Sequence, residues 1–476
     1  MKFKICLILV AIAGVFNSCS VPNAIPKETK VDLPESYATS LDSLGSSFVV
    51  NWKDYFQDPY LTELIDTALV NNKEMNILMQ RIQRSKNEIS ARTGEYLPSI
   101  AAGFRSDIEK VGKYTRAGAV EEGLEIREGK ENPEFLGNLE LGLFASWEVD
   151  IWKKLRNAKK ASVLEYMASM EGKNFLTTNL IAEIANSYYE LLALDYQMKN
   201  LNQNLEIQQN ALDVVKLLQQ AGRVNSLAIK RFEAEVQKNK SERFIINQEI
   251  VQVENTINFL LGRGPQPIAR DTSDFIEMQP VFMDQTVPSE LLDNRPDIRK
   301  AEYELAAARI NIDVARTNFY PTLDIKAGIG FQAFKPKFLL NTPESILFSL
   351  AGDVVAPLVN RRAIEAEFYN ANAMQIERAY EYEQTVLNAY IEVANLLSNV
   401  ENLNASFDLK MNQVDALTES IEISNQLFQS ARIEYLEVLL TQREALEARS
   451  DLINIRKEQF LTSINIYKAL GGGWQS

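Results

Sequence analysis

The sequence contains no histidine, and its two cysteines, Cys6 and Cys19, both lie at the extreme N-terminus. The missing histidines remove the commonest general base and the commonest metal ligand. Beyond residue 19 no thiol remains for a disulfide, a zinc site or a nucleophile. We therefore expect no enzyme, no catalytic residue, no cofactor and no metal site.

An excess of positive charge is also missing. The 476 residues carry 50 Lys and Arg against 64 Asp and Glu, a net charge of −14. A protein that wraps nucleic acid needs a basic surface, so we expect no nucleic-acid partner. With 46% apolar and 24% charged residues, the chain is also unlike a disordered protein or a bundle of membrane-spanning helices.

The N-terminus reads as a secretory signal. Lys2 and Lys4 precede an apolar run over 5–16, which is shorter than the ~20 residues that a spanning helix needs. The run ends in a small residue followed by Cys19, which resembles a bacterial lipoprotein cleavage site. This predicts a signal peptide over 1–18 and Cys19 as the acylated (palmitate-bearing) first residue of an extended leader, 19–60. An ordinary signal peptide with an incidental cysteine is the alternative.

The chain repeats itself. Shifted by 209 residues, 185–262 aligns without a gap on 394–471, and both copies end on the same Leu-Gly. A single register over this length indicates two structural repeats rather than similar composition. We place them at 61–270 and 288–476, with a linker at 271–287. Each is expected to begin with a helix, over 61–93 and 288–318.

Four segments alternate apolar and polar residues with a period of two, which is typical of strands. They lie at about 97–106, 138–150, 320–334 and 345–357, two in each repeat. About ten residues is the length of a membrane-spanning β-strand with one lipid-facing and one polar side. A half-buried strand of a soluble sheet alternates in the same way, so the pattern alone leaves both open.

After the strands, each repeat continues in a long helical hairpin, over 154–262 and 361–470. At ~1.5 Å per residue, the helical stretch 154–221 would reach ~100 Å, far more than a compact domain needs. A 3–4 spacing of mostly apolar residues predicts a coiled-coil seam, which Gln208 interrupts. This seam consists of Met198, Leu201, Leu205, Gln208, Leu212 and Val215.

Four spanning strands cannot close a barrel, because the smallest common membrane barrel has ~8 strands and lipid does not tolerate open edges. Several chains must therefore combine, and three would supply twelve strands. The helical hairpins leave from the same strands and would continue the ring as a cylinder. A mostly α-helical coiled-coil tunnel on a membrane β-barrel is the fold class that follows.

A known family matches these features. The segment 287–302, VPSELLDNRPDIRKAE, resembles the mid-chain signature of the outer membrane factor family, the TolC-like efflux channels, in the NodT-type lipoprotein branch. The segments 308–323 and 147–156 are similar to other parts of the family pattern. The resemblance implies a homotrimeric, twelve-stranded barrel in the outer membrane and a tunnel through the periplasm. It also implies a periplasmic adaptor (membrane fusion) protein and an inner-membrane pump as partners, with small molecules exported.

The resemblance further implies site residues. Family members contact the adaptor with the tips of the two hairpins. The matching positions here are Gly222, Arg223, Val224, Asn225 and Ser226 in the first tip, and Ala431, Arg432, Ile433, Glu434 and Tyr435 in the second.

In relatives, acidic rings near the second tip narrow the tunnel and hold it closed. Glu437 falls on one such position and Leu440 on another. A gate that is part electrostatic and part hydrophobic is therefore expected. The alternative is that Glu437 is an ordinary solvated helix residue.

Two other functions remain open at this point. A soluble coiled-coil scaffold or adaptor would explain the helices and the acidity but not the paired strand segments. An outer membrane conduit for protein secretion would have the same architecture with a different cargo.

Overall fold

The structure is a computed structural model, and it describes residues 21–30, 34, 51–271, 275–282, 294–430 and 432–474. The chain divides into two compact units. The first unit contains Met1–Glu28, Gln83–Met167 and Tyr303–Ala379. The second contains Thr29–Ile82, Ala168–Glu302 and Tyr380–Ser476. The signal peptide and Cys19 lie outside the described residues.

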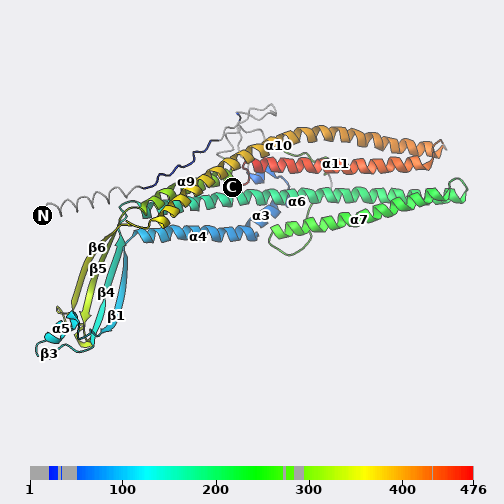
Figure 1. The fold of residues 1–476 in the computed structure, drawn as a ribbon. Coiled ribbons are helices and arrows are strands. Elements are labelled where there is room, and N and C mark those ends of the chain that lie inside the picture. The colour runs from blue at the N-terminus through cyan, green and yellow to red at the C-terminus, as the bar shows by residue number, and fades with distance from the viewer. Residues whose placement is uncertain are drawn as a thin grey trace. The chain divides into compact units, whose positions relative to one another are not determined.

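The first unit contains one antiparallel sheet of four strands in the order β1-β4-β5-β6 (Figure 1). Its strands are β1 Ser99–Glu109, β4 Leu136–Glu148, β5 Thr322–Ala333 and β6 Ile346–Val355. Their ends differ by one to three residues from those that the alternation predicted. Because β4 pairs directly with β5, the strand pair of the first repeat and the strand pair of the second form one sheet.

The strand register places most of the apolar residues of the four strands on one face. Leu143 pairs with Ala102 on one side and with Ile329 on the other, and Ile329 pairs with Phe348. Ile329 is 58% exposed and Phe348 is 73% exposed, so no other part of the described chain covers this face. A one-residue slip of any strand would turn its apolar side chains to the polar face.

The opposite face carries mainly polar residues and glycines, together with Leu347 and Val355 of β6 and the aromatic ring of Phe144. A Cβ atom at Gly103 would lie 3.3 Å from the Phe144 ring, and one at Gly328 would lie 3.2 Å from it. Phe144 therefore lies over glycines of both neighbouring strands. This explains an apolar side chain on the polar face, because an aromatic ring covers the backbone that glycine leaves bare.

Short elements fill the connections between the strands. Helix α5, Arg116–Gly123, and the strands β2, Glu125–Arg127, and β3, Lys130–Glu131, lie between β1 and β4. The Thr115 hydroxyl caps α5 by accepting a hydrogen bond from the Gly118 N–H at 3.1 Å. A 3-10 helix, η1 Pro336–Phe338, lies between β5 and β6.

The single helix expected over 61–93 is two helices. After the short α2, Trp52–Tyr55, come α3, Pro59–Asn71, and α4, Lys73–Tyr96. Asn72 separates them: its Oδ1 accepts from the Met75 N–H at 2.9 Å, and its Nδ2 donates to the Leu260 carbonyl at 2.9 Å. The Asn72 side chain thus caps α4 and gives a carbonyl at the end of α7 a hydrogen-bond partner. Both contacts favour a break between the helices at this residue.

Four long helices form the two hairpins. They are α6 Lys154–Gln220, α7 Ser226–Leu260, α10 Arg362–Gln429 and α11 Tyr435–Ala469 (Figure 1). Helix α9, Pro296–Thr317, precedes β5. The start expected for it at 288 lies outside the described residues. The matching lengths of α6 and α10, and of α7 and α11, follow the sequence repeat.

The repeat extends to the way each hairpin ends. Gly262 and Gly471 both have positive φ, +68° and +85°, and a Cβ there would lie 2.5 Å from the carbonyl oxygen of Asn71 or Asn294. Glycine is required at both positions because of the left-handed backbone and the close approach. Arg295 donates to the Ala469 carbonyl at 3.0 Å, just as Asn72 donates to Leu260. Arg295 thus occupies in the second repeat the place that Asn72 has in the first.

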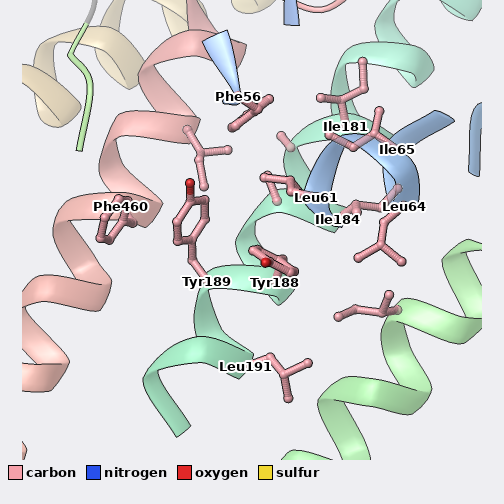
Figure 2. Packing of buried hydrophobic residues seen from close by; sticks show 14 of the residues in the cluster. Phe56, Leu61, Leu64, Ile65, Ile181, Ile184, Tyr188, Tyr189, Leu191 and Phe460 are labelled. Atoms are coloured by element: carbon pink, nitrogen blue, oxygen red, sulfur yellow. The ribbon is translucent and has the colours of Figure 1, made fainter. Parts of the chain in front are cut away.

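The second unit has an aromatic-rich core where helices of both repeats meet (Figure 2). Tyr189 of α6 stacks on Phe460 of α11 with ring centroids 4.4 Å apart. The neighbouring Tyr188 donates its hydroxyl to Asp58 at 2.7 Å. Burial and the nearby Asp58 carboxylate raise the pKa of Tyr188 above its ordinary value, so this hydroxyl stays protonated as a donor.

Candidate functional site

The first hairpin tip is a tight turn between α6 and α7. Gly222 has a φ of +73° and ends α6, and the Arg223 N–H donates to the Leu218 carbonyl at 2.9 Å. This is the helix-ending arrangement that glycine favours. Asn225 then caps α7 by accepting from the Ala228 N–H at 3.2 Å. Gly222, Arg223, Asn225 and Ser226 are exposed, and Val224 is half-buried.

The second tip has a related backbone without the side-chain cap. The Arg432 N–H donates to the Leu427 carbonyl at 2.9 Å, the counterpart of the bond made by Arg223. Glu434 occupies the cap position of α11 but accepts no hydrogen bond there. Arg432 and Glu434 are exposed. Ala431 lies outside the described residues.

The structure brings the two tips together through Tyr435. Its ring lies 4.9 Å from Phe232 of α7 and 4.4 Å from Phe428 of α10, centroid to centroid. Burial raises the pKa of Tyr435 to about 12. Ile433 and Val224, one from each tip, pack against the same cluster. The tips therefore form one joint surface, with a cavity of about 740 Å³ between them.

The two expected gate residues lie just beyond this cluster on α11. Glu437 is in the first turn of the helix and is exposed, whereas Leu440 is half-buried. Residues three apart share a face of a helix, so the two side chains neighbour each other. Val438 and Leu439 point the other way, into the tip cluster. The structure thus leaves Glu437 available to a partner or to solvent.

Aromatic residues border the sheet where β4 ends and β5 begins. Trp152 donates its Nε1–H to the Pro321 carbonyl at 2.7 Å, and its ring lies 4.9 Å from Tyr320. Trp147 donates to the Tyr96 carbonyl at 3.1 Å. Trp and Tyr with an apolar ring and a satisfied polar end are typical of membrane–water interfaces.

The junction from β4 to α6 is fixed by Asp150, whose side chain is 2% exposed. Its carboxylate accepts from the Leu155 and Arg156 backbone N–H groups and from Arg156 Nε, each at 3.0 Å. Burial acts to raise the pKa of Asp150, but the hydrogen bonds from Arg156 and Leu155 hold it below its ordinary value. The charged form is therefore the one that caps α6.

An acidic row crosses three strands of the sheet. Glu148 pairs with Asp324, and Asp324 pairs with Asp353, so three carboxylates cross three strands on the polar face. Lys326 forms an ion pair with Asp353 at 3.2 Å. Only the strand register brings these residues together, and alternation within one segment gives no information about register between segments.

Among the described residues, no helix combines the length and apolar character needed to cross a membrane.

Within the same residues, no group of three or more Asp, Glu, His or Cys side chains is arranged to hold a metal ion.

The family assignment rests on a match over most of the chain. The family model described as "Outer membrane efflux protein" matches residues 64–263 and 287–472, which cover most of both repeats. The chain belongs to the outer membrane efflux protein family. It is thus an efflux channel protein of the outer membrane, and membership excludes the soluble coiled-coil scaffold.

Named relatives of this outer membrane efflux protein cover nearly its whole length. The pyoverdine export outer membrane protein OpmQ of Pseudomonas aeruginosa is 25% identical over 431 residues, 90% of this chain and 89% of OpmQ. The probable outer membrane lipoprotein SilC of Salmonella typhimurium is 22% identical over 477 residues, 99% of each chain.

A solved structure agrees in fold. The open-state MtrE outer membrane channel of Neisseria gonorrhoeae superposes with a TM-score of 0.83 at 23% identity, covering 96% of this chain and 98% of MtrE.

Proposed function

We propose that this outer membrane efflux protein is a homotrimeric conduit of a tripartite efflux system. It would receive small molecules from a periplasmic adaptor protein and an inner-membrane pump and release them outside the cell. The observation that carries the proposal is the sheet of four strands. It has one mostly apolar, exposed face and two edge strands, β1 and β6, that each have a strand neighbour on one side only within the described chain.

The trimer follows from the need to close this sheet. An open edge is not tolerated in lipid, and four strands are too few for a barrel. Three copies supply twelve strands if β1 of one copy pairs with β6 of the next. The apolar face of Leu143, Ile329 and Phe348 would then face lipid, and the acidic row of Glu148, Asp324 and Asp353 would face the lumen.

The joint surface of the two tips supports an adaptor contact. Its exposed groups include Arg223, Asn225, Arg432 and Glu434, and Tyr435 holds the two tips in one arrangement. A rigid polar rim around a cavity is a suitable surface for a protein partner. Gly222, Val224, Ser226, Ala431 and Ile433 complete the proposed contact set.

Glu437 and Leu440 are proposed as the periplasmic gate. In a trimer, three Glu437 carboxylates would converge near the axis, where they repel one another unless protonated or paired with cations. Leu440, one turn further along α11, would add an apolar constriction. Such rings combine cation preference with a narrow, poorly hydrated passage.

Cys19 is proposed as the lipid attachment site. A single acyl chain gives only marginal membrane binding, so the anchor would act together with the barrel. The relative SilC carries the word lipoprotein in its name. Export of a protein instead of small molecules is the second candidate, and the name of OpmQ, a pyoverdine export protein, favours the small-molecule cargo.

The experiment that tests the conduit is electrical recording from purified protein in a planar lipid bilayer. Stepwise, long-lived conductance is the expected result. Phe104→Lys, on the apolar face of β1, should abolish insertion and conductance, because a charge facing lipid is costly. The matched control Asp107→Lys, on the polar face of the same strand, should retain both. Absence of conductance from a trimeric wild-type preparation would refute the proposal.

A further inference from the structure

Both strand-to-helix turns of the first unit contain a strained residue. The first turn joins β4 to α6, and the second joins β6 to α10. Lys153 has a φ of +62° in the first turn, and Asn360 has a φ of +55° in the second. In the part of the chain that the structure describes, these are the only residues other than glycine with positive φ. Left-handed backbone is unfavourable for a lysine, and strain that recurs in both repeats indicates a functional role for these turns.

Each turn exposes two apolar side chains just before its strained residue. These are Ile151 and Trp152 in the first turn and Leu358 and Val359 in the second. Val359 is 86% exposed. The two pairs lie directly beyond the ends of β4 and β6, and Val354 is the last residue of β6 on the exposed apolar face of the sheet. Exposed apolar residues therefore continue from the sheet into both turns.

A basic residue follows the apolar pair at the end of each turn. Lys153 and Arg362 are both exposed, and neither side chain forms an ion pair or a hydrogen bond with another described residue. The carboxylates beside the first turn are already occupied, since Glu148 and Asp150 pair with other basic residues of α6. The two turns thus leave positive charge unpaired next to exposed apolar side chains.

These charges do not stabilise the helices that they precede. A positive charge at the N-terminal end of a helix is opposed by the helix dipole, and the first turn of α6 contains no acidic residue. A free anion would explain the basic residues but not the apolar pairs. A lipid phosphate explains both, because the acyl chains of the lipid contact the apolar residues. Since a zwitterionic headgroup brings a positive charge of its own, an anionic headgroup is the better match.

We infer that the two turns bind the headgroups of anionic phospholipids in the leaflet on the helical side of the membrane. Lys153 and Arg362 pair with the lipid phosphates, and the exposed apolar pairs enter the boundary between headgroups and acyl chains. The turns thereby fix how deeply the sheet lies in the membrane, once in each repeat. The inference rests on the proposed function in one respect, namely that the sheet is inserted in lipid.

The test is native mass spectrometry of the full-length protein in detergent, titrated with dioleoyl-phosphatidylglycerol or, separately, with dioleoyl-phosphatidylcholine. Because the two lipids have the same acyl chains, a difference in apparent Kd reports on the headgroup alone. The wild type should bind the anionic lipid at least about fivefold more tightly. Lys153→Asn combined with Arg362→Gln should remove this preference. Asparagine is chosen because Asn360 already has the same backbone conformation in the second turn.

Lys240→Asn combined with Arg84→Gln is the matched control, because it removes the same charge from exposed positions on other helices. It should keep the wild-type preference. Inorganic phosphate at the concentration of the lipid should not displace the anionic lipid.

Three results would overturn the inference: equal binding of both lipids by the wild type, the same change of preference in the double variant and the control, or displacement of the anionic lipid by inorganic phosphate. Conductance in a planar bilayer judges the conduit separately. A wild type that conducts without a headgroup preference would contradict this inference alone, and one with the preference but no conductance would contradict the conduit alone.

Discussion

At the scale of single residues, a few buried charges decide how the helices begin and end. Arg295 is 8% exposed and reaches three partners: Asp297 at 2.9 Å, Glu392 at 2.8 Å and the Ala469 carbonyl. Burial alone would lower the pKa of this guanidinium, but the two carboxylates hold it above its ordinary value. Arg295 therefore stays charged and joins α9, α10 and α11.

Replacing Arg295 by Met should destabilise the protein by about 3–5 kcal/mol, because Asp297 and Glu392 lose their buried partner. Arg295→Lys should recover only a part of this loss, since a lysine cannot form the same forked contacts. Thermal unfolding of the purified protein measures both. The control is Arg84→Met at an exposed arginine, and an equal loss of stability there would contradict this explanation.

The contribution of Asp150 to the stability of the fold should depend on pH. Its pKa in the folded protein is depressed, so its contribution to stability is present above the unfolded pKa and is lost as pH falls through the folded pKa. Asp150→Asn should therefore cost about 1–2 kcal/mol at neutral pH. This difference should shrink as the buffer is acidified below the ordinary Asp pKa.

The measurement is the unfolding midpoint of wild type and Asp150→Asn over a pH series. Asp313→Asn serves as the control, because Asp313 is exposed and has only a long contact, 3.8 Å, with Arg316. A difference between wild type and Asp150→Asn that stays constant down to the lowest pH would show that the charge of Asp150 is not what stabilises this junction.

The gate gives a third prediction at this scale. Glu437→Ala and Leu440→Ala should each raise single-channel conductance, by at least about twofold if their rings form the narrowest point. Glu447→Ala, exposed on the same helix, should not. Unchanged conductance in both gate variants would place the constriction elsewhere.

At the scale of the elements, the seam between α6 and α7 contains a polar pair. Gln208 and Asn239 are both buried and share a hydrogen bond of 2.8 Å. The shift of 209 residues places Leu417 and Ala448 at the same two positions in the second repeat. A buried polar pair costs stability but fixes the register of two helices.

The proposed role of the polar pair can be tested by giving the first repeat the apolar residues that the second repeat has at these positions. Gln208→Leu alone should lower stability by about 1–3 kcal/mol, because Asn239 loses its partner. The double variant Gln208→Leu with Asn239→Ala should regain or exceed wild-type stability. Thermal unfolding of the wild type, Gln208→Leu, Asn239→Ala and the double variant gives the coupling energy. Additive effects would contradict a specific pairing.

The elements also show how far the sequence could predict the fold. Alternation placed four strands to within three residues, since one face of each strand is mostly apolar. The break at Asn72 was missed because helical periodicity continues through it, and the contact that favours the break is with the distant Leu260. The joint surface of the tips was likewise hidden, because Tyr435 contacts Phe232 across two hairpins.

At the scale of the whole molecule, a single chain leaves its sheet open at both edges. Its sheet has two edge strands and an exposed apolar face, whereas its second unit has an aromatic-rich core of its own. Such an asymmetry is expected of a chain whose stability in the membrane depends on copies of itself. The sequence indicated this from the strand number alone, and the number three came from the family resemblance.

Single-particle electron microscopy of the full-length protein in lipid nanodiscs tests this central claim most directly. The account predicts three copies around one axis, with β1 of each copy hydrogen-bonded to β6 of the next in a closed ring of twelve strands. The bore should continue from the barrel between the helical hairpins. A single copy with free strand edges, or a ring in which β1 and β6 do not meet, would contradict it.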